Sequence, residues 1–176
     1  MQLMPSRVAQ TDLFDKKIRA NEADLLAYFQ RRTPNGADAA DAFGELLLIA
    51  WKQRVKIPSE AAAARMWLFG AARNVLQNQR RSTQRASEAV QRLADTMRVL
   101  VPEFSSDEDS VMLRAAIQDL PPEDAELMRL VYWDGFRSHE AAAILGLNAS
   151  TARSRIAKSL GELRRVLVVD VVGSNQ

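Results

Sequence analysis

The chain has 176 residues, 47% of them hydrophobic and 26% charged, which provides apolar material for one large domain or two small ones and argues against disorder. Cysteine is absent and His139 is the only histidine, so the composition excludes disulfides, thiolate chemistry and a metal site built from several histidines. The formal net charge is only +2. Neither an 18-residue apolar run nor a hydrophobic leader is present, so we expect a cytoplasmic protein. We also expect no cofactor and no metal.

Three helices are predicted in the N-terminal half of the chain. The first spans residues 11–32 and ends at the turn Thr33–Gly36, because Thr-Pro-Asn-Gly is strong turn chemistry. The second runs from about residue 38 to 54, with apolar side chains at helical spacing. The third opens at Pro58–Glu60 and continues to about Gln84 or beyond. The apolar stripe of the second helix consists of Ala39, Ala42, Phe43, Leu46, Leu47 and Ala50.

An acidic, flexible linker is predicted over residues 88–109. Within it the segment Glu103–Asp109 is acidic, small and polar, which is typical of a connection between domains, although apolar residues before this segment leave open a helix that extends into the linker. Since runs of β-branched residues are almost absent before Val166, the chain is predicted to be all-α. Two small helical domains, residues 10–87 and 110–170, are expected on either side of the linker.

Beyond the linker, helices are predicted to resume near Ser110 and again at Pro121–Pro122, where prolines and first-turn acids suit a helix start. Gly135 is expected to terminate the second of these as a C-cap glycine. Two further helices are predicted at residues 138–145 and 149–167. A short helix, a turn that contains glycine and a longer helix together form a helix-turn-helix pattern.

This helix-turn-helix pattern is the sharpest functional signal in the sequence. Gly146 falls at the turn, where a positive φ is needed. The second helix is apolar on one face and small, polar or basic on the other, which suits a DNA major groove; the alternative is an ordinary surface helix with solvated charges. The apolar face consists of Ala152, Ile156, Leu160, Leu163 and Leu167, and the opposite face of Ser150, Ser154, Lys158 and Arg165, flanked by Arg153 and Arg155.

A second group of polar residues lies on the helix that follows Pro58. Amides and arginines beside an aromatic ring can read and stack unpaired bases. The alternative is that Trp67 belongs to the core and that the polar residues form a solvated face. The group consists of Arg73, Gln77 and Arg80 on one face, Asn74, Asn78 and Arg81 beside them, and Trp67 on the stripe of Asn74 and Asn78.

A third group forms an outer stripe on the helix 38–54, away from its apolar stripe. Asp41, Glu45, Leu48 and Lys52 recur there at helical spacing. An acidic and partly apolar stripe can dock a basic helix of a partner protein, whereas the alternative is a solvated face. Patterns typical of catalysis are missing: the adjacent Ser138, His139 and Glu140 do not build a triad, and no phosphate-binding glycine loop is present, so we expect no enzyme activity.

Taken together, these segments resemble bacterial RNA polymerase sigma factors of the extracytoplasmic-function (ECF) group in the sigma-70 family. The segments Asp38–Trp51 (DAADAFGELLLIAW) and Trp67–Arg81 (WLFGAARNVLQNQRR) resemble region 2 of that family. The segment Leu120–Phe136 (LPPEDAELMRLVYWDGF), which leads into the helix-turn-helix, resembles region 4. The resemblance covers roughly residues 12–84 and 110–167 and departs from the family pattern at single positions, of which Gly44 in place of a usual glutamine is one.

The resemblance implies a helical region 2 and a helix-turn-helix region 4, which bind core RNA polymerase and promoter DNA and assist promoter melting. It implies contacts with the β′ clamp helices and the β flap, and the group commonly has an anti-sigma partner. It implies polymerase contacts at Asp38, Asp41, Glu45, Leu48 and Lys52. It implies −10 element contacts at Arg54, Lys56, Trp67, Arg73, Asn74, Gln77, Asn78, Arg80 and Arg81. It implies −35 element contacts at Ser150, Thr151, Arg153, Ser154, Arg155 and Lys158.

Two further hypotheses remain beside the sigma factor. One is a stand-alone helix-turn-helix transcriptional regulator whose N-terminal domain senses a signal or dimerises. The other is a helical adaptor that has lost DNA contact. The pairing of Asp38–Trp51 with Trp67–Arg81 favours the sigma factor, because a regulator has no need for both segments.

Overall fold

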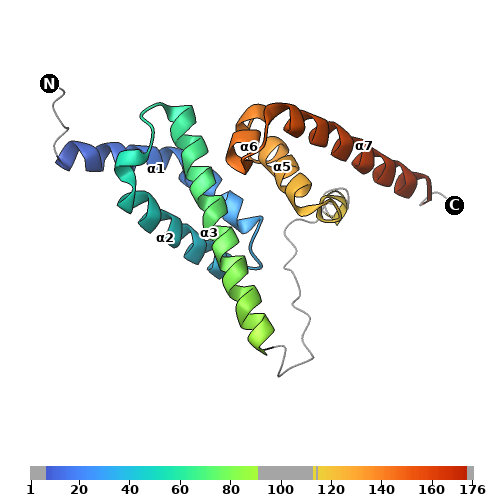
Figure 1. Cartoon of the computed structure of the whole chain (residues 1–176), viewed down its shortest axis with the longest axis horizontal. Coiled ribbons are helices and arrows are strands. Elements are labelled where there is room, and N and C mark those ends of the chain that lie inside the picture. Colours follow the sequence, from blue (N-terminus) through green and yellow to red (C-terminus); the bar gives the residue numbers. More distant parts are fainter. Residues whose placement is uncertain (1–6, 91–112, 114, 174–176) are drawn as a thin grey trace. The chain divides into compact units, whose positions relative to one another are not determined.

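A computed structural model describes residues 7–90, 113 and 115–173, with side chains described over 11–82, 113 and 115–165. These residues form helices joined by turns and contain no β-strand, which confirms the predicted all-α class. The chain divides into two compact units, Met1–Pro102 and Glu103–Gln176 (Figure 1). None of the helices in the described part of the chain combines the length and the hydrophobicity that a membrane span requires.

The first unit consists of three α-helices that pack against one another and a short 3₁₀ helix. The first two helices begin a few residues before their predicted starts and end two residues before their predicted ends, and the third continues past Gln84. α3 enters the segment predicted as linker at residues 88–90, and residues 91–109 of that segment lie outside the described residues. The elements are α1 (Arg7–Gln30), α2 (Gly36–Lys52), η1 (Arg54–Lys56) and α3 (Ala61–Val90).

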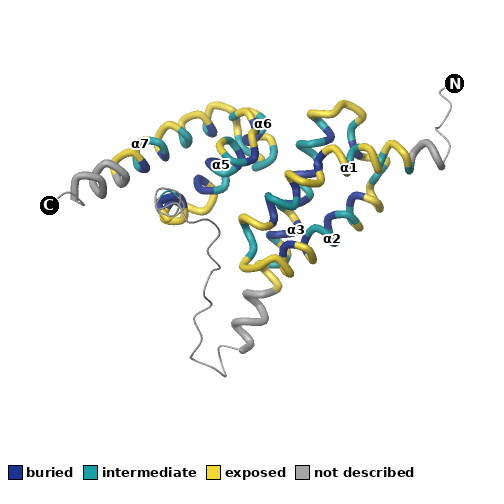
Figure 2. The backbone as a smooth tube through the Cα atoms, turned by 180° about the vertical axis from the view of Figure 1, so that it is seen from behind, coloured by how far each residue is buried: buried dark blue, intermediate teal, exposed yellow. Residues whose placement is uncertain are grey.

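The core of this unit forms where the apolar stripes of α1, α2 and α3 meet, as Figure 2 shows. Tyr28 lies at its centre, in edge-to-face contact with Phe29 and Phe69 at centroid distances of 5.6 and 5.3 Å. The predicted stripe of α2 is confirmed, with Phe43 and Leu47 only half-buried. The fully buried large side chains of the unit are Leu25, Tyr28, Phe29, Leu46, Leu68, Phe69 and Val75.

Side chains at the helix starts fix where α2 and α3 begin. Asn35 Oδ1 accepts a hydrogen bond from the backbone N–H of Asp38 at 2.9 Å, so α2 begins at Gly36, two residues before its predicted start. At α3, the Glu60 carboxylate accepts hydrogen bonds from the backbone N–H groups of Ala62 and Ala63 at 2.9 and 2.7 Å. These caps satisfy backbone donors that have no partner within the helix.

The second unit contains a short helical stretch at residues 115–118 followed by three helices, α5 (Pro122–Tyr132), α6 (Ser138–Leu145) and α7 (Ala149–Gly173). α7 runs six residues past its predicted end at Leu167, and no proline or glycine lies between Leu167 and Gly173. The core of the second unit combines buried residues from all of these segments. One cluster consists of Ala116, Ile117, Leu120, Ala125, Met128 and Leu163, with Leu113, Trp133, Ile156 and Leu160 packed against it.

Two glycines with positive φ lie in the turns of this unit; Gly146 caps α6 as predicted, whereas the C-cap of α5 is Trp133 and not the predicted Gly135. Gly135 has φ of 73° just after α5, and Gly146 has φ of 70° at the end of α6. After α6, Leu147 N–H donates to Ala142 O at 2.8 Å, which closes the helix end with the left-handed glycine inside the turn. The sharp turn between α6 and α7 therefore has a defined backbone conformation, so the two helices are held as a helix-turn-helix.

Candidate nucleic-acid and partner surfaces

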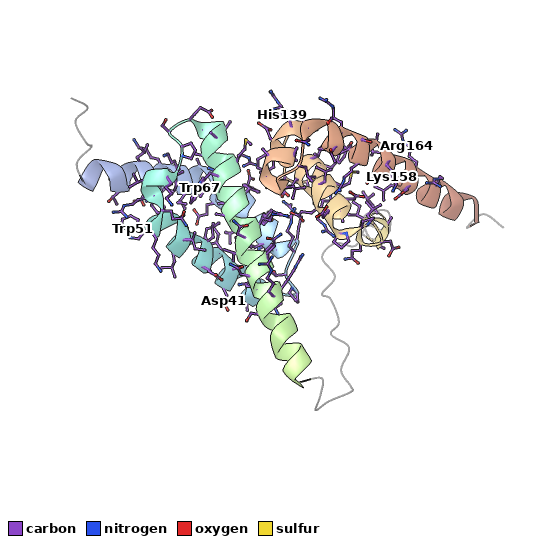
Figure 3. All side chains as sticks on the ribbon, viewed as in Figure 1. Asp41, Trp51, Trp67, His139, Lys158 and Arg164 are labelled. Carbon is purple, nitrogen blue, oxygen red and sulfur yellow. The ribbon has the colours of Figure 1, made fainter. Side chains whose placement is uncertain are left out.

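The exposed face of α7 has a central row of small residues between two basic rows. On a 100° helical projection, Ser150, Ser154, Ala157 and Gly161 lie on the exposed side. Two basic rows flank them, Arg153 with Arg164 on one side and Lys158 with Arg165 on the other, and all four are exposed. Figure 3 labels Lys158 and Arg164 on this helix. Small residues leave room for close approach of a nucleic-acid groove, and exposed basic rows beside them can pair with phosphates.

The buried face of α7 partly matches the prediction. Ala152 and Leu163 are buried, and Ile156 and Leu160 are partly buried against the core of the unit. Ser159 is also buried, although hydrophobic periodicity excludes a serine from a predicted core. Of the predicted −35 contacts, Ser150, Arg153, Ser154 and Lys158 are exposed, whereas Thr151 and Arg155 are half-buried. Leu167 lies outside the residues whose side chains are described.

Arg155 is engaged within the protein. Its Nη1 donates to Glu123 Oε2 of α5 at 2.7 Å and lies 3.5 Å from Asp124 Oδ1. The hydrogen bond with Glu123 raises the pKa of the Arg155 guanidinium, so this side chain stays fully charged. Sequence reasoning places Arg155 on the DNA flank of the helix, because a contact between residues 32 positions apart leaves no trace in helical periodicity.

The polar group on α3 is accessible, as predicted. Arg73 and Gln77 are half-buried, and the remaining polar members of the group are exposed. Trp67 is also half-buried, so it is neither enclosed in the core nor free on the surface. A partly exposed aromatic ring can stack on a base. The exposed polar members are Asn74, Asn78, Arg80 and Arg81.

The loop between α2 and α3 is anchored at several points. Arg54 donates from Nη1 to Trp51 O at 3.0 Å and stacks on the Trp51 ring, with Cζ 4.6 Å from the ring centroid. Ile57 is buried, and its carbonyl accepts a hydrogen bond from Lys17 Nζ at 3.2 Å. Lys56 is exposed. Glu60 caps α3, and the hydrogen bonds that its carboxylate accepts from two backbone N–H groups lower its pKa.

The predicted outer stripe of α2 is also accessible. Asp38, Asp41, Leu48 and Lys52 are exposed and Glu45 is half-buried, with Leu48 at 62% exposure. Exposed apolar side chains indicate a binding surface where they cluster. Trp51, a neighbour of Leu48 on the same helix, is exposed at 41% and therefore supports a binding surface here. Sequence reasoning did not select Trp51 as a site residue. Figure 3 labels Asp41 and Trp51 on α2, and the Trp51 ring meets Phe14 of α1 edge to face at 5.3 Å.

No group of acidic residues, histidine or cysteine suited to hold a metal ion occurs among the described residues. His139 is an exposed residue of α6.

Two family models match the chain in the order that the units have. Residues 18–86 match the model described as Sigma-70 region 2, and residues 110–163 match the model described as Sigma-70, region 4. The fold and the surfaces thus define a sigma-70 type protein with both regions. ECF RNA polymerase sigma factor SigL of Mycobacterium tuberculosis is 30% identical over 151 residues, 82% of this chain and 83% of the relative. The chain belongs to the ECF sigma factors of the sigma-70 family.

Other comparisons agree with this assignment. ECF RNA polymerase sigma factor EcfG of Rhodopseudomonas palustris is 30% identical over 163 residues, 91% of this chain and 88% of the relative. Among solved structures, the sigma factor RpoE in complex with the anti-sigma factor NepR from Bartonella quintana has a TM-score of 0.71 at 23% identity, covering 89% of this chain and 98% of that chain. At this identity the structural match shows the shared fold.

Proposed function

We propose that the chain binds core RNA polymerase and directs it to promoters, by recognising the −35 element with α7 and the −10 element with α3 and by assisting promoter melting. One observation carries this proposal. The chain presents an exposed small and basic helix face on a helix-turn-helix in one unit and an exposed amide and arginine face on a helix of the other. A protein that reads one duplex site needs only the first of these.

For the −35 element, α7 is the helix that enters the major groove of duplex DNA. Arg153 is exposed on one flank and is suited to bidentate hydrogen bonding with guanine. Ser150 and Ser154 lie on the exposed face, where their hydroxyls reach base edges or phosphates. Lys158 forms an ion pair with Glu162 at 3.8 Å, a contact at an exposed site that a DNA phosphate replaces at little cost.

For the −10 element, α3 and the loop before it bind unpaired bases. Separating the strands costs about 1.4 kcal/mol of stacking per step, so single-strand contacts have to compensate for it. A base stacked on a side chain returns about 1–3 kcal/mol, and Trp67 and the Trp51–Arg54 pair offer such surfaces. The loop at residues 54–60 is the proposed receptor for an extruded non-template base. Asn74, Asn78, Arg80 and Arg81, with Arg73 and Gln77, supply the polar contacts along α3.

For the polymerase, the outer stripe of α2 is the proposed contact with the β′ clamp helices, and the helix-turn-helix unit contacts the β flap. Leu48 is the apolar member of this stripe and lies between the half-buried Glu45 and the exposed Lys52. An apolar anchor within a polar rim is the usual composition of a specific protein interface. Asp38 also belongs to the helix start, since it hydrogen-bonds to Asn35. An anti-sigma factor is a further expected partner, as in the RpoE–NepR complex.

Run-off transcription with purified bacterial core polymerase tests this function. The template pool carries randomised −35 and −10 boxes, and the reactions are run with and without the protein. We expect transcripts that depend on the protein and come from one enriched pair of boxes. Co-elution with core polymerase without transcripts would support an adaptor instead. Neither co-elution nor transcripts would support a stand-alone helix-turn-helix regulator.

A further inference from the structure

One nitrogen of Arg155 lies between two carboxylates of another helix. Arg155 Nη1 is 2.7 Å from Glu123 Oε2 and 3.5 Å from Asp124 Oδ1, both in the first turn of α5. The Asp124 side chain is only 12% exposed, and its Oδ1 is buried and accepts no hydrogen bond from the described residues. A buried carboxylate oxygen in this state depends on a nearby positive charge. Arg155 provides that charge from α7.

The position of this contact determines what it controls. Arg155 lies on α7 at the border between the buried face, with Ala152 and Ser159, and the exposed face, with Ser154 and Lys158. A link at this border, made to the start of α5, opposes rotation of α7 about its own axis. Rotation of α7 would move Ser154 and Lys158 away from the groove, so the link bears directly on how the helix presents its reading face.

We propose that Arg155 is a positioning residue of the −35 interface, which fixes α7 against α5 and does not itself bind DNA. This inference rests on the proposed function and changes one member of the predicted set of −35 contacts. To reach a phosphate, Arg155 would have to give up a charge-assisted hydrogen bond of 2.7 Å and leave Asp124 without its counter-charge. Arg153, which is exposed and has no ion-pair partner among the described residues, bears no such cost.

The substitution Glu123→Gln distinguishes the two possible roles of Arg155, because they predict opposite changes in the affinity of the holoenzyme for the promoter. If Arg155 positions α7, loss of its partner weakens binding of the holoenzyme to a promoter that depends on its −35 element. If Arg155 binds DNA, the same substitution releases it and removes a negative charge, so binding is unchanged or tighter. Glu123 is 68% exposed, so its replacement is compatible with folding. Asp119→Asn, which removes an exposed acid next to α5, is the matched control.

The experiment measures holoenzyme affinity for one promoter duplex over a series of salt concentrations. We expect Glu123→Gln and Arg155→Gln each to weaken binding about two- to fivefold, the range of one partly exposed ion pair, with no further loss in the double variant. The salt slope should stay unchanged for these variants and fall by about one for Lys158→Gln, which removes a proposed phosphate contact. Asp119→Asn should bind at least as well as the unmodified protein.

Unchanged or tighter binding by Glu123→Gln, or a lower salt slope for Arg155→Gln, would overturn the positioning role and make Arg155 a DNA contact. Additive losses in the double variant would also overturn it, because two residues that act as a pair cannot lose the pair twice. Failure of the underlying function looks different. In that case the unmodified holoenzyme would be indifferent to replacement of the −35 box, and no variant would change its affinity.

Discussion

Lys17 of α1 donates a hydrogen bond from Nζ to the carbonyl oxygen of Ile57, 40 residues later in the chain, at 3.2 Å. The bond fixes the loop between α2 and α3 from the side of α1. Burial lowers the pKa of Lys17, so the cost of desolvating the ammonium group offsets part of the stabilisation from this hydrogen bond. Its net contribution is therefore about 1 kcal/mol.

Replacing Lys17 tests whether this loop takes part in promoter opening. Lys17→Met keeps the length of the side chain but removes the donor, so the loop at residues 54–60 should loosen while the bundle stays folded. We expect open-complex formation, measured by permanganate reactivity of the −10 region, to fall about fivefold, the equivalent of 1 kcal/mol. Co-elution with core polymerase should not change. Equal permanganate reactivity for both proteins would mean that the hydrogen bond from Lys17 to the loop has no role in promoter opening.

Leu48 tests the polymerase contact. Because 62% of this side chain is exposed, Leu48→Arg should leave the thermal midpoint within the range of ordinary surface substitutions. If Leu48 anchors the interface, affinity for core polymerase should drop at least about tenfold, which corresponds to 1.4 kcal/mol. Leu13→Arg is the matched control, since Leu13 is an exposed leucine of α1 outside the stripe. Equal losses for both variants in a pull-down titration would mean that the stripe is not specific.

Gly44 and Gly146 should respond to alanine with opposite signs. Gly44 lies inside α2, and a Cβ there meets no atom within 4 Å, so Gly44→Ala should stabilise the protein by about 1 kcal/mol through helix propensity. At Gly146 there is equal space, but φ is 70°, so Gly146→Ala should cost about 1–2 kcal/mol of backbone strain. Chemical denaturation of the two variants gives both values. Destabilisation by Gly44→Ala would mean that the glycine serves a contact in α2 beyond propensity.

Glu60 predicts a pH dependence of stability. Hydrogen bonds from Ala62 and Ala63 N–H lower the pKa of Glu60 from its ordinary value of 4.5. A carboxyl group with a lowered pKa stabilises the folded state above its unfolded-state pKa and loses that effect as the pH falls through the folded-state pKa. Thermal midpoints should therefore differ between the unmodified protein and Glu60→Gln at pH 7, and the difference should shrink at pH 3. A constant difference would assign the effect to packing.

Hydrophobic periodicity and turn residues predict most of the fold. The apolar stripe of α2, the turn at Gly146 and the helix-turn-helix around it depend on local sequence, and the structure confirms them. The helix ends are less predictable: α3 continues to Val90 because no proline or glycine occurs between Gly70 and Pro102. An absent breaker permits a helix but does not show where it stops.

The candidate surfaces are predictable as faces and less so as contacts. Helical spacing places Asp41, Leu48 and Asn78 on the outside, and all three are exposed. It also places Arg155 on the outside, whereas in the structure Arg155 forms an ion pair with Glu123. It does not predict that Ser159 is buried. Both differences depend on which residue of a distant helix lies opposite, and a periodic pattern within one helix contains no such information.

Site-specific crosslinking tests most directly whether the two units read two promoter elements. A photoreactive amino acid is placed at Ser154 of α7 in one protein and at Asn78 of α3 in another, both exposed positions. Each protein is assembled with core polymerase on a promoter selected from the randomised pool. We predict that position 154 crosslinks to the −35 duplex and position 78 to the non-template strand of the −10 element. Crosslinks of both positions to the same element, or of neither to promoter DNA, would contradict the assignment of α7 and α3.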